Sequence, residues 1–254
     1  MIIGIYFSGT GNTKYCVERF ITEYRNGNHF YSIESPEALK QIENNDEIVI
    51  GYPVQYSNIP KILRDYITAH QNVWKEKKIF IIATMGLFSG DGAGMLARLL
   101  SSYGAVITGG LHLKMPDCIA DVKALKRSYA KNKELVMKAD EKIRKTVLRM
   151  RQGKPPQEGL GIAYHFAGLF GQRLYFFRKT MKYTDKLKIN ARKCTACGLC
   201  VKLCPMGNIS MEDGIAVSGD RCTMCYRCIS KCPGQAITLL GKQVIEQHDI
   251  SRYV

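Results

Sequence analysis

Two cysteine motifs near the C-terminus restrict the fold of this 254-residue chain more than any other feature of its sequence. Each has the form C-x2-C-x2-C-x3-C-P, and eight of the ten cysteines belong to the two copies. The first copy runs from Cys194 to Pro205, and the second, from Cys222 to Pro233, follows at an offset of 28 residues. Units this small cannot fold on a hydrophobic core alone, so they must be cross-linked.

Metal ligation is favoured over disulfides as that cross-link. Met1 leads directly into a strand-like run, so we expect no secretory signal and a cytoplasmic chain. Zinc sites usually combine two C-x2-C pairs some distance apart, which these tight runs fit poorly. Three thiolates within seven residues can instead bind three irons of one cubane, while the fourth, before proline, binds the other cluster.

Residues 187–241 resemble the bacterial ferredoxins that hold two [4Fe-4S] clusters, because all eight cysteines and both prolines are present. The resemblance implies that Cys194, Cys197, Cys200 and Cys232 bind one cluster. It implies that Cys222, Cys225, Cys228 and Cys204 bind the other. This interleaving would make cluster assembly part of folding. Tyr226, which stands where the first copy has Gly198, is interpreted as a packing residue rather than an electron conduit.

The first 120 residues alternate strand-like and helix-like stretches. Nearly charge-free runs predict strands at Ile2–Phe7, Glu47–Gly51 and Ile79–Thr84, with weaker candidates at His29–Ile33 and Ala105–Leu113. Helical patterns lie between them at Thr13–Tyr24, Ile59–His70 and Gly92–Tyr103. This alternation predicts an α/β fold with a doubly wound, five-stranded parallel sheet.

The first strand ends in a loop rich in glycine and hydroxyl groups, Ser8-Gly-Thr-Gly-Asn-Thr13. Such a loop, which opens a helix at the carboxyl end of a parallel strand, is a site for a phosphate. Lys14 is in the wrong register for a P-loop, and it stands where a dinucleotide-binding fingerprint needs its third glycine. The remaining chemistry binds a phosphate dianion through N–H and O–H donors without a metal.

This loop resembles the FMN phosphate loop of flavodoxins, and the resemblance covers about residues 1–150. It implies the strand order 2-1-3-4-5, with FMN at the strands' carboxyl ends. The implied phosphate ligands are Ser8, Thr10, Gly11, Asn12 and Thr13; the implied ring contacts are Pro53, Val54 and Tyr56 on one side and Thr84, Met85, Gly86 and Gly92 at the polar edge. Tyr56 is the candidate for stacking on the ring; the alternative is a loop tyrosine packed on the sheet edge.

Positive charge is concentrated in the middle of the chain. The formal net charge is +15, of which residues 121–190 contribute +12 from 18 Lys and Arg and 6 Asp and Glu. Asp121 is a candidate N-cap for a long helix that ends near Arg151, and basic residues from Lys123 onward line one face of it. We interpret that face as solvated, or as a docking site for an acidic redox partner, in preference to a nucleic-acid site.

Several other residues receive less specific interpretations. The segment Leu160–Phe177 is rich in apolar residues, but His165, Gln172 and Arg173 make it too polar for a membrane span. We interpret it either as a helix held between domains or as a surface for a partner or an anionic membrane. Trp74 is expected at the surface or at a helix cap, and Asp91 as a solvated turn residue. Cys16 is expected in the core, and Cys118 has no assigned role. His29, His70, His112 and His248 have no paired acid at a useful sequence spacing, and His165 is interpreted as a packed histidine.

The whole chain resembles flavodoxin–ferredoxin fusion proteins, a family associated with anaerobic bacteria and archaea. We divide it into a flavodoxin-like FMN domain at 1–152, a linker or docking helix at 153–186, a small α+β two-cluster ferredoxin domain at 187–241 and a C-terminal tail at 242–254. The resemblance implies an electron carrier that connects FMN, two [4Fe-4S] clusters and an acidic partner, namely a ferredoxin, flavodoxin or oxidoreductase. The alternative is a flavin-dependent reductase of a small molecule that the clusters supply with electrons.

Overall fold

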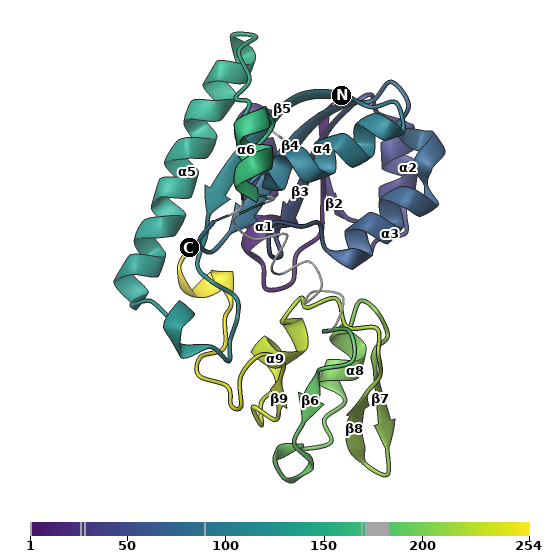
Figure 1. The fold of residues 1–254 in the computed structure, drawn as a ribbon, viewed down its shortest axis with the longest axis vertical. Helices are drawn as coiled ribbons and strands as arrows, with labels where there is room; N and C mark the ends of the chain where they lie inside the picture. The colour runs from purple at the N-terminus through teal and green to yellow at the C-terminus, as the bar shows by residue number, and fades with distance from the viewer. Residues whose placement is uncertain (1, 26, 28, 89, 169, 171–182) are drawn as a thin grey trace.

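The computed structural model describes residues 2–25, 27, 29–88, 90–168, 170 and 183–254. Figure 1 shows two parts: an N-terminal domain built on one large sheet, and a smaller cysteine-rich domain below it. Of the predicted segment Leu160–Phe177, the structure describes α6 (Ile162–Gly168), whereas 171–177 lie outside the described residues. No helix among the described residues is long and apolar enough to cross a membrane.

The N-terminal domain is a parallel sheet in the order β2-β1-β3-β4-β5, as predicted. Its strands are β1 (Ile2–Tyr6), β2 (Phe30–Ser32), β3 (Glu47–Pro53), β4 (Lys78–Met85) and β5 (Val106–Lys114). Ile48 of β3 lies opposite Ile3 of β1 and Ile79 of β4. These three central strands consist almost entirely of buried residues because helices cover both faces of the sheet.

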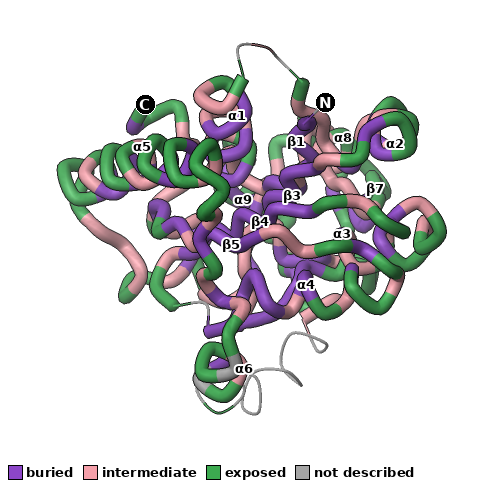
Figure 2. The backbone as a smooth tube through the Cα atoms, turned by 90° about the horizontal axis from the view of Figure 1, so that it is seen from above, coloured by how far each residue is buried: buried purple, intermediate pink, exposed green. Residues whose placement is uncertain are grey.

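The helices are divided between the two faces (Figure 2). α1 (Asn12–Tyr24) and α5 (Tyr129–Arg151) pack on one face, around Phe20, Phe80 and Ile143. α2 (Glu37–Glu43), α3 (Lys61–Ala69) and α4 (Gly92–Ser102) pack on the other. The sequence analysis did not identify α2, because seven residues are too few for a helical repeat to show.

Two predictions about this domain are wrong. The long helix starts at Tyr129 rather than at Asp121, and its N-cap is Ser128, whose hydroxyl accepts from the Lys131 N–H at 3.3 Å. The preceding residues instead cross the carboxyl ends of the strands, with η2 (Lys123–Leu125) among them. Trp74 is fully buried rather than at the surface. The turn η1 (Gln71–Trp74) directs its ring into the core, where the indole N–H donates to the Ile67 carbonyl at 3.2 Å.

The cysteine-rich domain contains two small antiparallel sheets and two short helices. β6 (Lys188–Ile189) pairs with β9 (Ile237–Thr238), and β7 (Ile209–Glu212) pairs with β8 (Ile215–Ser218). The helices α8 (Leu199–Leu203) and α9 (Arg227–Lys231) each follow the second cysteine of a motif, and η4 (Ala191–Lys193) precedes the first motif.

The repeat in the sequence is also a repeat in the backbone. Positive φ angles occur at pairs of residues 28 apart: 56° at Ala196 and 55° at Met224, then 67° at Gly198 and 59° at Tyr226. Both copies of the motif therefore adopt the same left-handed turns, although only one of these four residues is a glycine.

The C-terminal tail returns to the N-terminal domain. Figure 1 shows the C-terminus beside α5, after the short turn η5 (Ile250–Arg252). Tyr253 is 3% exposed and belongs to the core cluster between the sheet, α1 and α5. The tail therefore packs against the N-terminal domain.

Candidate functional site

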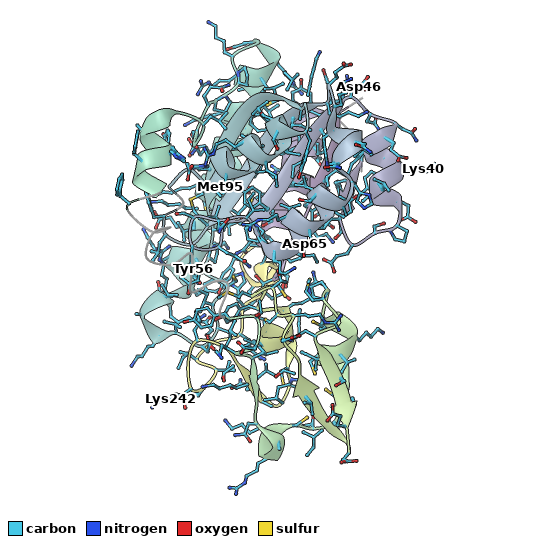
Figure 3. The ribbon with its side chains drawn as sticks, turned by 45° about the vertical axis from the view of Figure 1, so that its right-hand side comes forward. Lys40, Asp46, Tyr56, Asp65, Met95 and Lys242 are labelled. Atoms are coloured by element: carbon cyan, nitrogen blue, oxygen red, sulfur yellow. The ribbon has the colours of Figure 1, made fainter. Side chains whose placement is uncertain are left out.

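A cavity of about 450 Å³ lies at the carboxyl ends of the strands, between the two domains. Its size is in the usual range for sites of small ligands and cofactors. Ten of the twelve residues predicted to bind FMN line it, namely Ser8, Thr10, Asn12, Thr13, Pro53, Val54, Tyr56, Thr84, Met85 and Gly86. Gly11 and Gly92 do not. Figure 3 shows the labelled Tyr56 at the junction of the two domains.

The loop between β1 and α1 forms one end of the cavity. Gly11 directly precedes α1 and has φ +98°, a left-handed conformation that glycine adopts without strain. The Thr13 and Thr84 hydroxyls lie 2.7 Å apart, so they join the start of α1 to the end of β4. The first N–H groups of α1 have no acceptor within the helix itself, so a helix start of this kind can bind an anion such as a phosphate dianion.

The loop after β3 forms a second wall and has a strained turn. Tyr56 and Ser57 have φ values of +50° and +56°, which cost energy in residues other than glycine. Backbone hydrogen bonds between Gln55 and Asn58 close the turn, at 3.1 and 2.9 Å. The Gln55 amide donates to the carbonyl of Thr223, in the second cysteine motif, at 2.9 Å. The strained loop is thus held against the cysteine-rich domain.

A third wall, which the sequence analysis did not identify, follows β5. Met115, Pro116, Asp117, Cys118 and Ile119 line the cavity. Burial raises the pKa of the Asp117 carboxyl above its usual range. Burial also raises the pKa of the Cys118 thiol to about 12, so that it is protonated at neutral pH. No spacing in the sequence marks these residues, because only the crossing of 115–127 over the strand ends brings them to the cavity.

The fourth wall belongs to the second cysteine motif, at Met224, Cys225 and Tyr226. A Cβ at Gly9 would lie 2.0 Å from the Cys225 carbonyl oxygen, so only glycine allows the phosphate loop to approach this closely.

Arg227 forms a further polar link between this motif and the N-terminal domain. Its guanidinium pairs with both Glu34 oxygens at 2.8 and 2.7 Å and donates to the Ser8 carbonyl at 2.8 Å. This hydrogen-bonded pair raises the pKa of Arg227. A basic side chain therefore contacts the phosphate loop from the other domain.

The eight motif cysteines line two small cavities, each of about 20 Å³. We call them the distal set, which is Cys194, Cys197, Cys200 and Cys232, and the proximal set, which is Cys204, Cys222, Cys225 and Cys228. These are the two groups that the ferredoxin resemblance implies. No three His, Cys, Asp or Glu side chains of the described chain converge on a single metal-ion position.

Backbone N–H groups point at several of these sulfurs. Asn208 and Ala236, which are 28 residues apart, donate to Cys204 and Cys232 at 3.2 and 3.4 Å. Such N–H···S contacts stabilise thiolates that bind iron–sulfur clusters. The eight cysteines therefore fit two cubanes, and the larger cavity, with its phosphate loop, fits FMN.

Asp91 is not a solvated turn residue, as the sequence analysis expected: its side chain is fully buried. It pairs with Arg98, and its Oδ2 lies 3.1 Å from His165 Nδ1 in α6. The contact between Asp91 and His165 could not be predicted from the sequence, because the two residues are 74 positions apart.

The basic face between Lys123 and Arg151 is also smaller than predicted. Four members donate inward to backbone carbonyls: Lys126 to Glu246, Arg127 to Gly86, Lys142 to His112, and Arg151 to Glu23. Others form ion pairs along α5, such as Lys131 with Glu134 and Lys145 with Glu141. Part of the positive charge that the composition suggests for a partner is therefore used within the molecule.

Comparisons with known proteins match both parts of the chain. Residues 3–106 match the family model of a flavodoxin domain, and residues 186–244 match that of a 4Fe-4S dicluster domain. The chain thus combines a flavodoxin domain with a 4Fe-4S dicluster domain. No curated protein sequence matches it.

Solved structures similar to this chain include two flavodoxins and an oxidoreductase. The two-electron reduced flavodoxin of Megasphaera elsdenii is 20% identical, with a TM-score of 0.42 over 57% of this chain and 99% of that one. The Fusobacterium nucleatum flavodoxin bound to flavin mononucleotide is 15% identical, with a TM-score of 0.42 over 59% and 97%. Rubredoxin oxygen:oxidoreductase of Desulfovibrio gigas is 13% identical, with a TM-score of 0.40 over 58% of this chain and 36% of that one.

The two family matches support an electron-transfer function. A flavodoxin domain implies FMN, and a 4Fe-4S dicluster domain implies iron–sulfur clusters.

Proposed function

We propose that this protein carries electrons between FMN in the interdomain cavity, two [4Fe-4S] clusters and an external redox protein. The observation that carries the proposal is the composition of the cavity wall. Flavodoxin loops and the second cysteine motif line the same cavity, and Cys225 of the proximal set is on its surface. FMN exchanges one or two electrons and each cubane exchanges one, so joining them lets a two-electron centre be filled in single steps.

The contacts at this wall hold the proximal set close to the cavity. The Cys225 backbone packs on Gly9, and Gln55 binds the carbonyls of Thr223 and Met224 at 2.9 and 3.2 Å. Arg227 adds the ion pair with Glu34 across the same boundary. Together these contacts fix the distance between the flavin cavity and the nearest cysteine ligands.

The distal set supports an external port for electrons. Cys197 is exposed, whereas Cys228 of the proximal set is buried. Arg192 and Lys193 directly precede the first cysteine motif, and Lys202 lies within it. All three are exposed, and in the described part of the chain they pair with no carboxylate. Unpaired basic side chains accelerate encounter with acidic proteins. We therefore place the docking site of an acidic redox partner here rather than on α5.

The proposed function is tested by anaerobic stopped-flow mixing of the loaded protein with a reduced, acidic ferredoxin. Iron and sulfide should each be present at about eight per chain. Flavin reduction should be fast in protein that holds FMN and clusters, and slow in protein reconstituted with FMN alone. Equal rates in both preparations would show that the clusters do not supply the flavin.

The docking site is tested by reversing charges. The double variant Arg192→Glu/Lys193→Glu should lower the second-order rate with the acidic donor by about tenfold at low salt. The matched control is Arg144→Glu/Arg149→Glu, which reverses two exposed charges on α5. A larger effect of the control pair would place the partner on α5 instead.

A flavin-dependent reductase is the second candidate, because Asp117 places an acid in the cavity whose pKa is raised by burial. This function predicts turnover of a small oxidant in the presence of reduced ferredoxin, and its loss in Asp117→Asn. An electron carrier instead predicts that flavin reoxidation by a protein acceptor is unaffected by that change.

A further inference from the structure

The C-terminal tail reaches the phosphate loop of the flavodoxin domain. Gly11 tolerates no side chain, because a Cβ there would lie 2.4 Å from Ile250 Cγ2 of the tail. The Ile250 N–H also donates to the Thr10 carbonyl at 3.4 Å. The loop predicted to bind the FMN phosphate is therefore covered from outside by a segment about 240 residues away in the chain.

His248 makes the closest polar contact between the tail and the loop. Its Nε2 lies 2.9 Å from the Asn12 amide oxygen, while the Asn12 amide nitrogen donates to the Pro116 carbonyl at 2.7 Å. The amide oxygen of Asn12 therefore accepts from the Nε2–H of His248. Both ends of this amide are engaged, so its orientation at the start of α1 is held from two sides.

His248 itself is held in place. It is 3% exposed, and its ring stacks on Tyr253 with 5.7 Å between the ring centroids. The hydroxyl of Tyr253 accepts from the Asn132 amide of α5 at 3.2 Å. Lys126, Asp249 and Arg252 are the charged groups around the imidazole, and burial lowers the pKa of His248 to about 4. It is therefore a neutral donor at neutral pH.

The same tail is attached to α9 (Arg227–Lys231), which contains Cys228 and is directly followed by Cys232. The Gln247 amide donates to the carbonyls of Ile229 and Cys232 at 3.0 and 2.6 Å. The His248 N–H donates to the Ser230 hydroxyl at 3.4 Å, and Lys231 pairs with Asp249. Because α9 joins a proximal to a distal cysteine, the tail links the cluster-bearing helix to the phosphate loop.

We propose that the C-terminal tail is a component of the FMN site, in which His248 is a positioning residue that holds Asn12 and the phosphate loop in the phosphate-binding conformation. The proposal rests on the proposed function only in taking FMN as the ligand. Through Gln247, the tail makes FMN affinity depend on the position of α9.

The size of the effect follows from one hydrogen bond. Removing the His248 donor leaves the Asn12 amide oxygen unsatisfied and frees the loop, which should weaken FMN binding about tenfold. His248→Gln retains an N–H donor, so it should restore most of the affinity. Gln247→Ala leaves His248 in place but releases the tail from α9, and it should weaken FMN binding by a smaller factor in the same direction.

The experiment measures the dissociation constants of FMN and riboflavin for cluster-loaded protein, by quenching of flavin fluorescence under anaerobic conditions. Riboflavin lacks the phosphate, so a loop that positions the phosphate affects FMN alone. The proteins are the wild type, His248→Ala, His248→Gln, Gln247→Ala and the control His29→Ala, which removes an exposed imidazole.

The proposal predicts a Kd for FMN that rises about tenfold in His248→Ala, a Kd for riboflavin that stays unchanged, and recovery in His248→Gln. It is overturned if FMN affinity is unchanged, if both flavins weaken alike, or if His248→Gln behaves as His248→Ala. Wild-type protein that binds no FMN would instead refute the proposed function, which separates the two failures.

Discussion

The carboxylate of Asp121 joins the two domains through four hydrogen bonds, and its removal tests how they are joined. The side chain is 4% exposed. Its Oδ1 accepts from the Tyr226 hydroxyl at 3.1 Å, beside the flavin cavity. Its Oδ2 accepts three backbone N–H groups, at 2.6, 2.9 and 3.0 Å, from Leu239, Leu240 and Gly241.

The magnitude of the loss follows from this arrangement. Asp121→Ala leaves four donors without an acceptor in a buried place. Hydrogen bonds to charged groups contribute about 1.5–3 kcal/mol each, but members of one network are not additive, so we expect a loss of about 4 kcal/mol. Asp121→Asn keeps one carbonyl oxygen for the three backbone donors. It loses the charge, and its amide N–H replaces the oxygen that accepts from Tyr226, so that this hydroxyl must accept instead of donating; together these changes should cost about 1 kcal/mol.

The assay is thermal unfolding of the cluster-loaded chain, followed by cluster absorbance. For a chain of this size, about 1 kcal/mol shifts the apparent Tm by roughly 2–4 °C. Asp121→Ala should therefore lower it by about 8–16 °C and Asp121→Asn by about 2–4 °C. Asp220→Ala, which removes an exposed carboxylate of the cysteine-rich domain, is the control.

Two outcomes would refute this reasoning. If Asp121→Ala unfolds within error of Asp220→Ala, the carboxylate does not join the domains. If Asp121→Asn is as damaging as Asp121→Ala, the contribution comes from the charge rather than from satisfying the three backbone donors.

Three further predictions concern the loops, the clusters and pH. Gly11→Ala should weaken FMN binding and displace the tail. Gly198 also has a positive φ, but a Cβ there would meet no atom of the described residues within 4 Å, so Gly198→Ala should cost only about 1–2 kcal/mol of strain. Equal effects of the two changes on flavin affinity would contradict the contact between Gly11 and Ile250. Cys204→Ser should remove the electron paramagnetic resonance signal of the proximal cluster; loss of only the distal signal would show that the pairing is wrong. Burial lowers the pKa of His112 to about 4, below its unfolded value of about 6.5. Below pH 6.5 the unfolded chain therefore binds a proton that the folded chain does not. The free energy of unfolding should fall by up to about 3 kcal/mol between about pH 6.5 and about pH 4 and be unaffected by this group above about pH 6.5. His112→Gln should flatten that part of the stability profile in denaturant titrations, and an unchanged profile would exclude this histidine as its cause.

Much of the fold could be predicted because it depends on local patterns. Apolar runs such as Ile79–Thr84 identify strands buried on both faces, and their alternation with helices predicts a doubly wound parallel sheet. The observed strand order is the one that the flavodoxin resemblance implies. The two groups of four cysteines that line separate cavities are those that the ferredoxin resemblance implies. The flavodoxin resemblance places ten of twelve residues at one cavity for the same reason, since loops at the ends of parallel strands converge.

The errors have a common cause. Asp121 has the sequence environment of an N-cap, yet its carboxylate binds N–H groups almost 120 residues later. Trp74 lies beside several lysines, but a short turn directs its ring inward. Asp91 is surrounded by glycines and serine, yet it pairs with Arg98 and His165. Asp121 and Asp91 find partners up to 120 and 74 residues away, and the Trp74 ring is buried in a core assembled from several strands and helices, so the local sequence carries no information about these surroundings.

The sequence by itself thus determined which cofactors we expect in each domain, because the cysteine spacing and the loops at the strand ends are local properties. The tertiary structure alone decided how the halves are joined. It placed Cys225 on the flavin cavity, the carboxylate of Asp121 under the second cysteine motif, and His248 of the tail on Asn12. These contacts form because burying polar groups is favourable only when they find partners, and here each partner lies in the other domain or at the opposite end of the chain.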